Sequence, residues 1–230
     1  ADAAFCAAWG RDLVRAKLRR QQHVLAAGLA QRPDARKALL DAQASLARVA
    51  EALAADGLAS DSLRGLEGAA ARAYFQGLTA VMPPALGFTG RNRRPPRDPV
   101  NACLSLAYTL LHFDAVRAAH VAGLDPLLGF YHRPAFGRES LASDLIEPLR
   151  PRVDQWVWEL LRARTLREDH FASDKGACLL GKAGRGRFYT EWERVAVSLR
   201  RWLRVRAGAL ASTLRREGEA LLGDDEDETC

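Results

Sequence analysis

Three short segments of the sequence place side chains that can bind metal ions next to apolar residues. Glu67 lies within Gly-Leu-Glu-Gly, His132 ends Gly-Phe-Tyr-His, and Asp144 and Glu147 lie in Ser-Asp-Leu-Ile-Glu-Pro-Leu-Arg. Carboxylates and imidazoles are common metal ligands and can also transfer protons. Each segment alone is a weak signal, because each residue also has an ordinary structural interpretation.

Glu67 borders the apolar stripe of a predicted helix, between glycines that weaken that helix. A partly buried carboxylate at this place needs a cation or hydrogen-bond donors. The alternative is a surface glutamate paired with Arg64 or Arg72. His132 ends an apolar run on a connector that leaves the core, where its side chain can face inward, although a lone histidine there more often serves the structure.

Asp144 and Glu147 are three residues apart, so they share one face of a helix. This spacing lets two carboxylates converge on a site, and Pro148 perturbs the turn and could aim Glu147 outward. The alternative is a solvated acidic face bonded to Arg150 or Arg152. Neither interpretation is excluded by the spacing alone.

The elements that must position these side chains are predicted to be helices. Alanine and leucine dominate the apolar residues, whereas valine, isoleucine and threonine are scarce, and apolar residues recur at helical spacing. The fold class is therefore mainly α, with one helical domain over residues 1–222 and an acidic, disordered tail over residues 223–230. The predicted helices span about residues 1–29, 33–56, 60–82, 99–121, 140–147, 151–161 and 190–222.

Capping residues mark three of the predicted helix starts. Asp98 precedes a proline, which is the pattern of an N-cap acid followed by proline at the first helical position. Ser140 is predicted to cap the short helix, and Thr190 followed by Glu193 forms a capping-box pattern at the start of the last one. Segment 175–187 holds four glycines among basic residues, so it is predicted to be a loop or small hairpin.

The chain is basic, with 34 Lys and Arg against 28 Asp and Glu and a net charge of +6. Five of the acids lie together in the tail at 224–228, so the rest of the chain is more basic still. Nearly all of the positive charge is arginine, which binds phosphate bidentately and stacks on bases. A nucleic-acid partner is plausible, but a GC-rich genome would give the same composition.

The cysteines and the hydropathy pattern indicate a cytoplasmic protein. The cysteines are far apart and form no CxxC pair, which argues against a zinc knuckle or a disulfide framework. We find neither a signal segment nor an apolar run near the roughly 20 residues that span a bilayer. The first residue is Ala rather than Met, which suggests a piece of something longer.

Four motifs together resemble the CRISPR-associated Cas-one family, the integrase of spacer acquisition. They follow the family's order and lie near its spacing, which makes the set far more specific than any single motif. The motifs are Leu-Glu-Gly with Ala-Arg-x-Tyr-Phe (66–75), Arg-x-Arg-Arg-Pro-Pro-x-Asp-Pro-Val-Asn (91–101), Ala-Gly-Leu-Asp-Pro-x-x-Gly-Phe-Tyr-His (122–132) and Ser-Leu-Ala-Ser-Asp-Leu-Ile-Glu-Pro-Leu-Arg-Pro (140–151).

The resemblance implies that Glu67, His132 and Glu147 hold a divalent metal ion and are the catalytic residues, with Asp144 as a further acid beside them. Two carboxylates and one imidazole suit Mn²⁺ and tolerate Mg²⁺. The expected reaction is metal-dependent transesterification, which joins protospacer DNA 3′-hydroxyls to CRISPR repeat DNA, with endonuclease activity as a related reaction.

The resemblance also implies double-stranded DNA as substrate, a homodimer, and a small Cas-two partner protein flanked by two such dimers. Family members usually begin with a small β-rich domain, yet nothing before Gly57 alternates like strands. That domain is therefore expected to be absent or replaced. The candidates for phosphate contacts, each of which could equally be an ordinary solvated arginine, are Arg72, Arg91, Arg93, Arg94, Arg97, Arg133 and Arg138.

Two other functions fit parts of the sequence. A non-catalytic helical DNA-binding protein would need only the basic body, and its DNA binding would not depend on Glu67. A helical metal hydrolase that acts on a small phosphorylated substrate would use the same metal ligands, but it would not bind DNA in a salt-dependent way.

Overall fold

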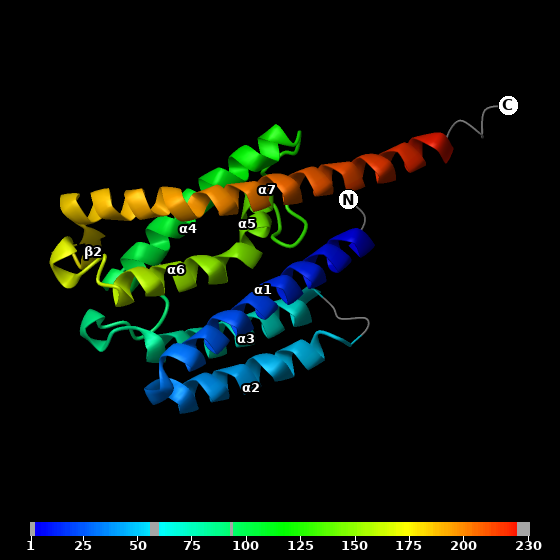
Figure 1. Ribbon diagram of the computed structural model, residues 1–230. Helices are drawn as coiled ribbons and strands as arrows, with labels where there is room; N and C mark the ends of the chain where they lie inside the picture. Colours follow the sequence, from blue (N-terminus) through cyan, green and yellow to red (C-terminus); the bar gives the residue numbers. More distant parts are fainter. Residues whose placement is uncertain (1–2, 56–59, 93, 225–230) are drawn as a thin grey trace.

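The computed structural model describes residues 3–55, 60–92 and 94–224, and within them the chain is mainly helical, as predicted (Figure 1). The described α-helices are α1 (Ala3–Gln31), α2 (Arg36–Ala52), α3 (Ser60–Val81), α4 (Pro99–Val121), α5 (Ser140–Ile146), α6 (Arg150–Arg162) and α7 (Lys182–Asp224). The short 3₁₀ helices are η1 (Pro33–Ala35), η2 (Pro84–Leu86), η3 (Glu147–Leu149) and η4 (Glu168–His170). Strands β1 (Phe171–Asp174) and β2 (Ala177–Leu180) form one antiparallel pair.

The first three helices pack side by side and form the lower layer in Figure 1. In α2 the buried residues Leu39, Ala42, Leu46 and Val49 recur every three or four positions, so one face of the helix is apolar. This face packs against α1 and α3. No strand occurs in residues 3–55, where helices α1 and α2 lie instead.

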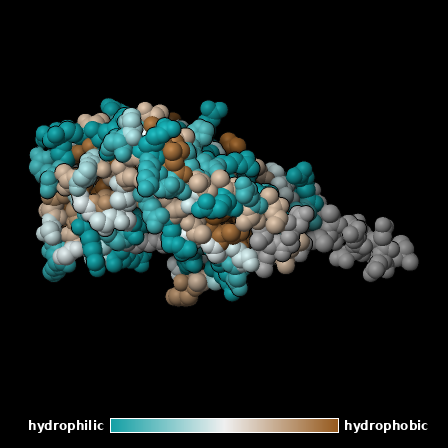
Figure 2. All heavy atoms as spheres, turned by 90° about the horizontal axis from the view of Figure 1, so that it is seen from below, coloured by the Kyte–Doolittle hydropathy of each residue, from teal (hydrophilic) through white to brown (hydrophobic). Residues whose placement is uncertain are grey.

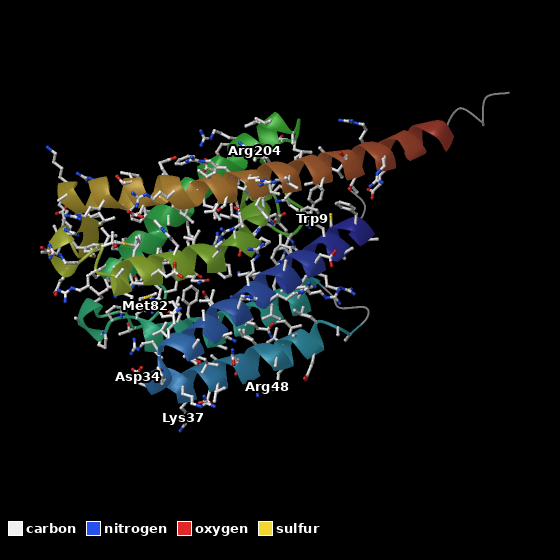
Figure 3. All side chains as sticks on the ribbon, viewed as in Figure 1. Trp9, Asp34, Lys37, Arg48, Met82 and Arg204 are labelled. Atoms are coloured by element: carbon white, nitrogen blue, oxygen red, sulfur yellow. The ribbon has the colours of Figure 1, made fainter. Side chains whose placement is uncertain are left out.

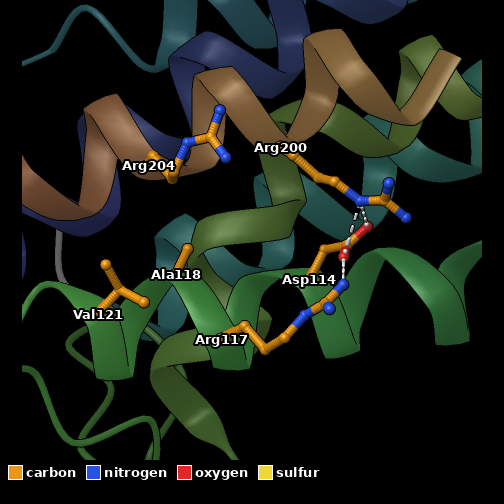
Figure 4. A pocket seen from close by; sticks show the side chains of 6 residues that line it. All are labelled: Asp114, Arg117, Ala118, Val121, Arg200 and Arg204. Carbon is orange, nitrogen blue, oxygen red and sulfur yellow. Dashed lines mark hydrogen bonds and ion pairs between the residues drawn. The ribbon is translucent and has the colours of Figure 1, made fainter.

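The second layer consists of α4 and α7, with α5 and α6 between the layers. Trp158 of α6 is fully buried, and its indole N–H donates to the carbonyl of Val81 at the end of α3, 3.1 Å away. On the other side, Arg200 of α7 donates to both oxygens of Asp114 of α4 at 3.1 and 3.0 Å, and Arg117 pairs with the same carboxylate (Figure 4). Helix α6 contacts both α1 and α4, so it joins the two layers.

Polar residues cover most of the face seen in Figure 2, where apolar residues form only small separate groups. None of the helices in the described residues is long and apolar enough to cross a membrane.

The start of α4 agrees with the prediction. Asp98 is the N-cap residue, and its side chain accepts a hydrogen bond from the backbone N–H of Asn101 at 2.8 Å. The helix ends at Val121, as its pattern indicated. A proline at the first helical position costs nothing, since its missing N–H would have had no partner in the helix.

The predicted start of the last helix at Thr190 is wrong, because α7 begins at Lys182. One of the glycines that suggested a loop, Gly184, allows close packing instead: a Cβ there would lie 2.8 Å from the carbonyl oxygen of His170. Thr190 lies inside the helix, where its hydroxyl donates to the carbonyl of Gly186 at 3.0 Å. A hairpin does form, but it spans residues 171–180.

Two smaller predictions also need correction. Ser140 does not cap α5, since the N-cap residue is Glu139 and the buried Ser140 hydroxyl donates to the carbonyl of Arg133 at 3.1 Å. At the C-terminal end, α7 continues to Asp224, two residues into the predicted tail that starts at 223. The rest of that tail, residues 225–230, lies outside the described residues.

A buried carboxyl group links three helices. Asp154 of α6 accepts hydrogen bonds from the hydroxyls of Tyr74 of α3, at 2.9 Å, and Tyr108 of α4. Burial raises the pKa of Asp154 from 3.8 to about 6, although the hydrogen bonds from Tyr108 and Tyr74 oppose the shift. This carboxyl group therefore takes up a proton within an accessible pH range.

We predict that the Asp154 carboxyl makes folding stability depend on pH. Its pKa is higher in the folded state, so its contribution is fully present below pH 3.8 and is lost as the pH rises through about 6. The free energy of unfolding of the wild type, relative to D154N, should fall by roughly 2–3 kcal/mol between pH 4 and pH 7. Urea unfolding at both values measures it, with D41N on the exposed face of α2 as control. The prediction would be contradicted if the free energy of unfolding of the wild type, relative to D154N, were the same at pH 4 and pH 7.

Candidate active site

The Asp144 carboxylate organises the segment that carries His132. It is fully buried at the C-terminal half of α5. One oxygen accepts from the backbone N–H groups of Phe130 (2.8 Å) and Tyr131 (3.0 Å). The other accepts from the backbone N–H of His132 (3.0 Å) and contacts Nδ1 of its ring (2.6 Å). These bonds satisfy a buried charge and fix the position of the connector.

The bond between Asp144 and His132 determines which ring nitrogen can bind a ligand. An ionised carboxylate only accepts hydrogen bonds, so Nδ1 of His132 carries the proton. The lone pair on Nε2 is then free to coordinate a metal ion, as in carboxylate–histidine–metal arrangements. Asp144 is therefore a positioning residue for His132.

The two predicted glutamates meet around the ammonium group of Lys17. Lys17 of α1 lies 2.5 Å from Oε1 of Glu67 and 2.6 Å from Oε2 of Glu147. Glu67 comes from α3 and Glu147 from η3, so three separate elements meet here. The hydroxyl of Tyr131 donates to the other oxygen of Glu67 at 2.7 Å.

The electrostatic environment keeps this cluster charged at neutral pH. Burial alone would raise the pKa of Glu147, but the positive charges of Arg150 and Lys17 hold it at about 2. Burial alone would lower the pKa of Lys17, yet the two carboxylates outweigh it and the pKa is raised. The ring of His132 packs edge-on against the ring of Tyr131, with centroids 5.3 Å apart, and the Tyr131 hydroxyl contacts Glu67, so the imidazole lies next to the cluster.

The geometry excludes the surface interpretation of Glu67. Arg64 pairs with Asp61 at 3.2 Å and donates to the carbonyl of Tyr131, and Arg72 is exposed to solvent. Neither arginine forms an ion pair with Glu67 among the described contacts.

The solvated acidic face proposed for Asp144 and Glu147 is also absent. Both side chains are buried, and Glu147 pairs with Arg150 at 3.2 Å inside the protein. The expectation that Pro148 aims Glu147 outward is wrong, because the turn of η3 directs the carboxylate towards α1.

The donor set fits a divalent ion. Among the described residues, no group of three His, Cys, Asp or Glu side chains is close enough to hold a metal ion as the side chains stand. However, Glu67 and Glu147 already share one cation, the Lys17 ammonium, and His132 presents a free ring nitrogen nearby. Two carboxylates and one imidazole form the kind of set that binds Mn²⁺ or Mg²⁺.

Sequence reasoning missed Lys17 and Tyr131 as members of the cluster, whereas it offered Arg150 as a partner of the Asp144 and Glu147 pair. A signal for Lys17 existed: it lies four residues from both Leu13 and Gln21, which are buried, and thus on the inner face of α1. A lysine on an inner face needs an anionic partner. Which anion it would meet could not be read from the spacing.

The arginines predicted to bind DNA lie in different environments. Arg91 contacts residues of its own chain, since its guanidinium donates to Asn101 at 2.8 Å and to Ser105 at 3.1 Å. Arg93 lies outside the described residues. The remaining candidates have exposed side chains and are Arg72, Arg94, Arg97, Arg133 and Arg138.

Gly129 allows the connector to turn tightly before His132. A Cβ at this position would lie 2.7 Å from the carbonyl oxygen of His132 and 2.7 Å from Cβ of Ser140. We predict that G129A lowers the free energy of unfolding by about 1–3 kcal/mol, because backbone atoms must move. Chemical denaturation measures the loss. The control G186A places a methyl group in open space on α7 and should not destabilise; equal stability of both variants would contradict the prediction.

Comparison with known proteins decides the family. The family model described as CRISPR associated protein Cas1 matches residues 1–194. The chain belongs to this family. The prediction made from the four motifs is thereby confirmed.

Curated Cas1 relatives match most of this chain. CRISPR-associated endonuclease Cas1 1 of Thermodesulfovibrio yellowstonii is 44% identical over 165 residues, which cover 71% of this chain and 52% of the relative. A CRISPR-associated exonuclease Cas4/endonuclease Cas1 fusion of Rhodospirillum rubrum is 37% identical over 223 residues, which cover 89% of this chain and 38% of the fusion. The chain thus spans about half, or less, of the length of these relatives.

Solved structures share the helical fold. A chain of a partial Cas6-RT-Cas1–Cas2 complex matches with a TM-score of 0.84 at 27% identity. The match covers 94% of this Cas1 chain and 67% of the chain in the complex. A Cas1 protein from Thermotoga maritima has a TM-score of 0.75 at 24% identity, over 89% of this chain and 64% of its own. A casposase bound to integration product has a TM-score of 0.72 at 22% identity, and the match covers 92% of this chain and 62% of the casposase chain. The last two show the fold alone.

Proposed function

We propose that this Cas1 chain is the catalytic part of a metal-dependent DNA integrase and endonuclease of CRISPR adaptation. The observation that carries the proposal is the meeting of Glu67 and Glu147 beside His132, whose ring Asp144 orients. The curated relatives are named as endonucleases, which supports nuclease chemistry.

In the proposed reaction the 3′-hydroxyl oxygen of a protospacer strand forms a bond to a phosphorus atom of the CRISPR repeat. The repeat strand's own 3′-oxygen leaves, so one phosphodiester bond forms for each one that breaks. Endonuclease activity is the same displacement with water as the nucleophile.

Glu67, Glu147 and Nε2 of His132 would hold Mn²⁺ or Mg²⁺. When bound, such an ion lowers the pKa of the attacking hydroxyl and stabilises charge at the phosphate. The protein's own residues prepare the site: Glu147 is ionised at neutral pH because its pKa is about 2. The Tyr131 hydroxyl holds Glu67, and Asp144 holds the imidazole.

The exposed Arg133 and Arg138 follow His132 on the same connector, where they can contact DNA phosphates beside the site. We predict that the double variant R133A/R138A binds duplex DNA about tenfold more weakly near 0.15 M salt, and that its log Kd changes less steeply with log salt, by up to about 0.9 per lost contact. Fluorescence anisotropy at graded salt measures both quantities. The control R36A/K37A removes two exposed charges from α2. Equal slopes in both variants and wild type would contradict the prediction.

The decisive test is strand transfer. Labelled protospacer-like duplex is incubated with a supercoiled plasmid that carries CRISPR repeats, in Mn²⁺, in Mg²⁺ and in EDTA. The proposal expects labelled plasmid only when a divalent ion is present. Salt-dependent DNA binding without any strand transfer or cleavage would favour the alternative, a non-catalytic helical DNA-binding protein.

We also propose a homodimer and a small Cas2 partner for this chain. Support for the Cas2 partner comes from two solved structures described as Cas6-RT-Cas1–Cas2 complexes, which resemble the chain at TM-scores of 0.83 and 0.84, whereas the homodimer rests on the family resemblance alone. Sedimentation of the chain with and without a Cas2 protein tests both parts. A monomer that does not bind Cas2 would overturn them without affecting the metal site.

A further inference from the structure

Lys17 occupies the two oxygens that a metal ion would need. Glu67 offers Oε1 to Lys17, while its Oε2 accepts from the Tyr131 hydroxyl at 2.7 Å. Glu147 offers Oε2 to Lys17, while its Oε1 faces Arg150 at 3.2 Å. In each carboxylate, one oxygen contacts a neighbouring side chain and the other contacts the ammonium group. A metal ion held by both glutamates competes with Lys17 for the same pair of oxygens.

The ammonium group and a divalent ion cannot share this space. Lys17 lies 2.5 and 2.6 Å from the two oxygens, within direct contact, and its side chain is only 12% exposed. Two positive charges a few ångströms apart repel strongly where water is largely excluded. A divalent ion that takes both oxygens must move the ammonium group, and the displaced charge then needs another anion.

We propose that Lys17 is an internal counter-ion that exchanges with the catalytic metal ion and then binds a phosphate of the bound DNA. This inference rests on the proposed function, since it takes the metal ligands and the DNA substrate from it. The exchange makes metal binding and DNA binding favour each other. Without DNA the ammonium group holds the carboxylates and weakens metal binding; with DNA, the phosphate receives the ammonium group. By linkage, the metal ion tightens DNA binding by the same factor.

The alternative role for Lys17 is a permanent structural ion pair. In that case, removal of the ammonium group leaves two carboxylates without their cation, but its effect on metal binding is the same with and without DNA. The two roles differ in the effect of DNA: exchange predicts that duplex DNA tightens Mn²⁺ binding to wild type but much less to variants with a neutral residue 17, and a permanent pair predicts the same effect of DNA on all of them.

The test uses direct Mn²⁺ binding, not activity. Free Mn²⁺ is measured by electron paramagnetic resonance for wild type, K17M and the control K37M, whose side chain points outward from α2 (Figure 3). Each protein is titrated alone and with a duplex whose 3′ ends lack the hydroxyl group, so that no strand transfer occurs. Thermal unfolding in EDTA and in Mn²⁺ is recorded in parallel. K17Q, whose neutral amide can donate to the carboxylates, is measured in the same way in case K17M does not fold in EDTA.

We expect K17M or K17Q to bind Mn²⁺ about tenfold more tightly than wild type without DNA, within the usual range of coupling between sites. The duplex should tighten Mn²⁺ binding to wild type and K37M by about the same factor, and to the Lys17 variants by less than about threefold. The midpoint of thermal unfolding of K17M should be lower than that of wild type in EDTA and should rise more on addition of Mn²⁺.

Two results overturn the proposal in distinguishable ways. If wild type binds Mn²⁺ and the Lys17 variants bind it no more tightly, or if the duplex changes Mn²⁺ binding by the same factor in wild type and the Lys17 variants, the exchange is wrong and the metal site stands. If neither wild type nor the variants bind Mn²⁺, with or without DNA, the metal site of the proposed function is wrong as well.

Discussion

Replacement of Glu147 by glutamine is expected to lower strand transfer by about 10³-fold or more, the range seen when a group that stabilises the transition state is removed. The carboxylate is one of the two that share a cation, and glutamine keeps its shape while removing its charge. The plasmid strand-transfer assay measures the loss. E67Q should behave in the same way, since Glu67 supplies the other carboxylate.

The control for this prediction is E51Q, which removes an exposed carboxylate from α2 and should retain full activity. E147Q leaves the half-buried Arg150 without its carboxylate partner, so the fold of the variant must be checked by circular dichroism and urea unfolding. E67Q disturbs the core less, because Glu67 is the more exposed of the two glutamates, with 22% of its side chain accessible against 4%. If each of the three single variants E67Q, E147Q and H132A carried out strand transfer at the wild-type rate, the assignment of the site would be wrong.

The second large effect is expected from D144N. An amide in this position cannot accept four hydrogen bonds as the carboxylate does, and its NH₂ group would face either the N–H groups of Phe130 and Tyr131 or the N–H and Nδ1 of His132. The imidazole then loses its fixed tautomer and orientation. We expect metal affinity and kcat to fall about 10–100-fold, the usual cost of losing the partner of a metal-binding histidine.

Several readouts separate this positioning role from simple loss of fold. DNA affinity in EDTA should stay close to wild type, while Mn²⁺ affinity falls and the NMR signals of the His132 ring shift. D125N is the matched control: it lies on the same connector, is exposed, and accepts from the backbone N–H of Leu127 at 2.8 Å. If D144N reduces DNA affinity and Mn²⁺ affinity to the same extent, the variant has lost its fold and the positioning role is not supported.

The sequence by itself determined most of the helices and the side chains worth testing. Helix α4 could be placed because Asp98 and the following proline act within one turn of chain, where capping depends only on neighbours. The motifs around Glu67, His132 and Glu147 identified the family, and the comparison confirms it. The start of α7 could not be placed, because Gly184 packs against His170, a residue outside the helix that the local pattern does not reveal.

Only the tertiary structure decided how the site works. Lys17 is 50 residues from Glu67 and 130 from Glu147, so no local pattern relates them. Their contact exists because α1 packs against α3 and η3. Asp144 and Glu147 have the same charge and are only three residues apart in the sequence. Yet Asp144 binds a histidine and Glu147 binds a lysine, because each faces a different neighbour. Helix formation depends on residues within a turn or two, whereas the role of a buried charge is set by whatever long-range packing brings to it.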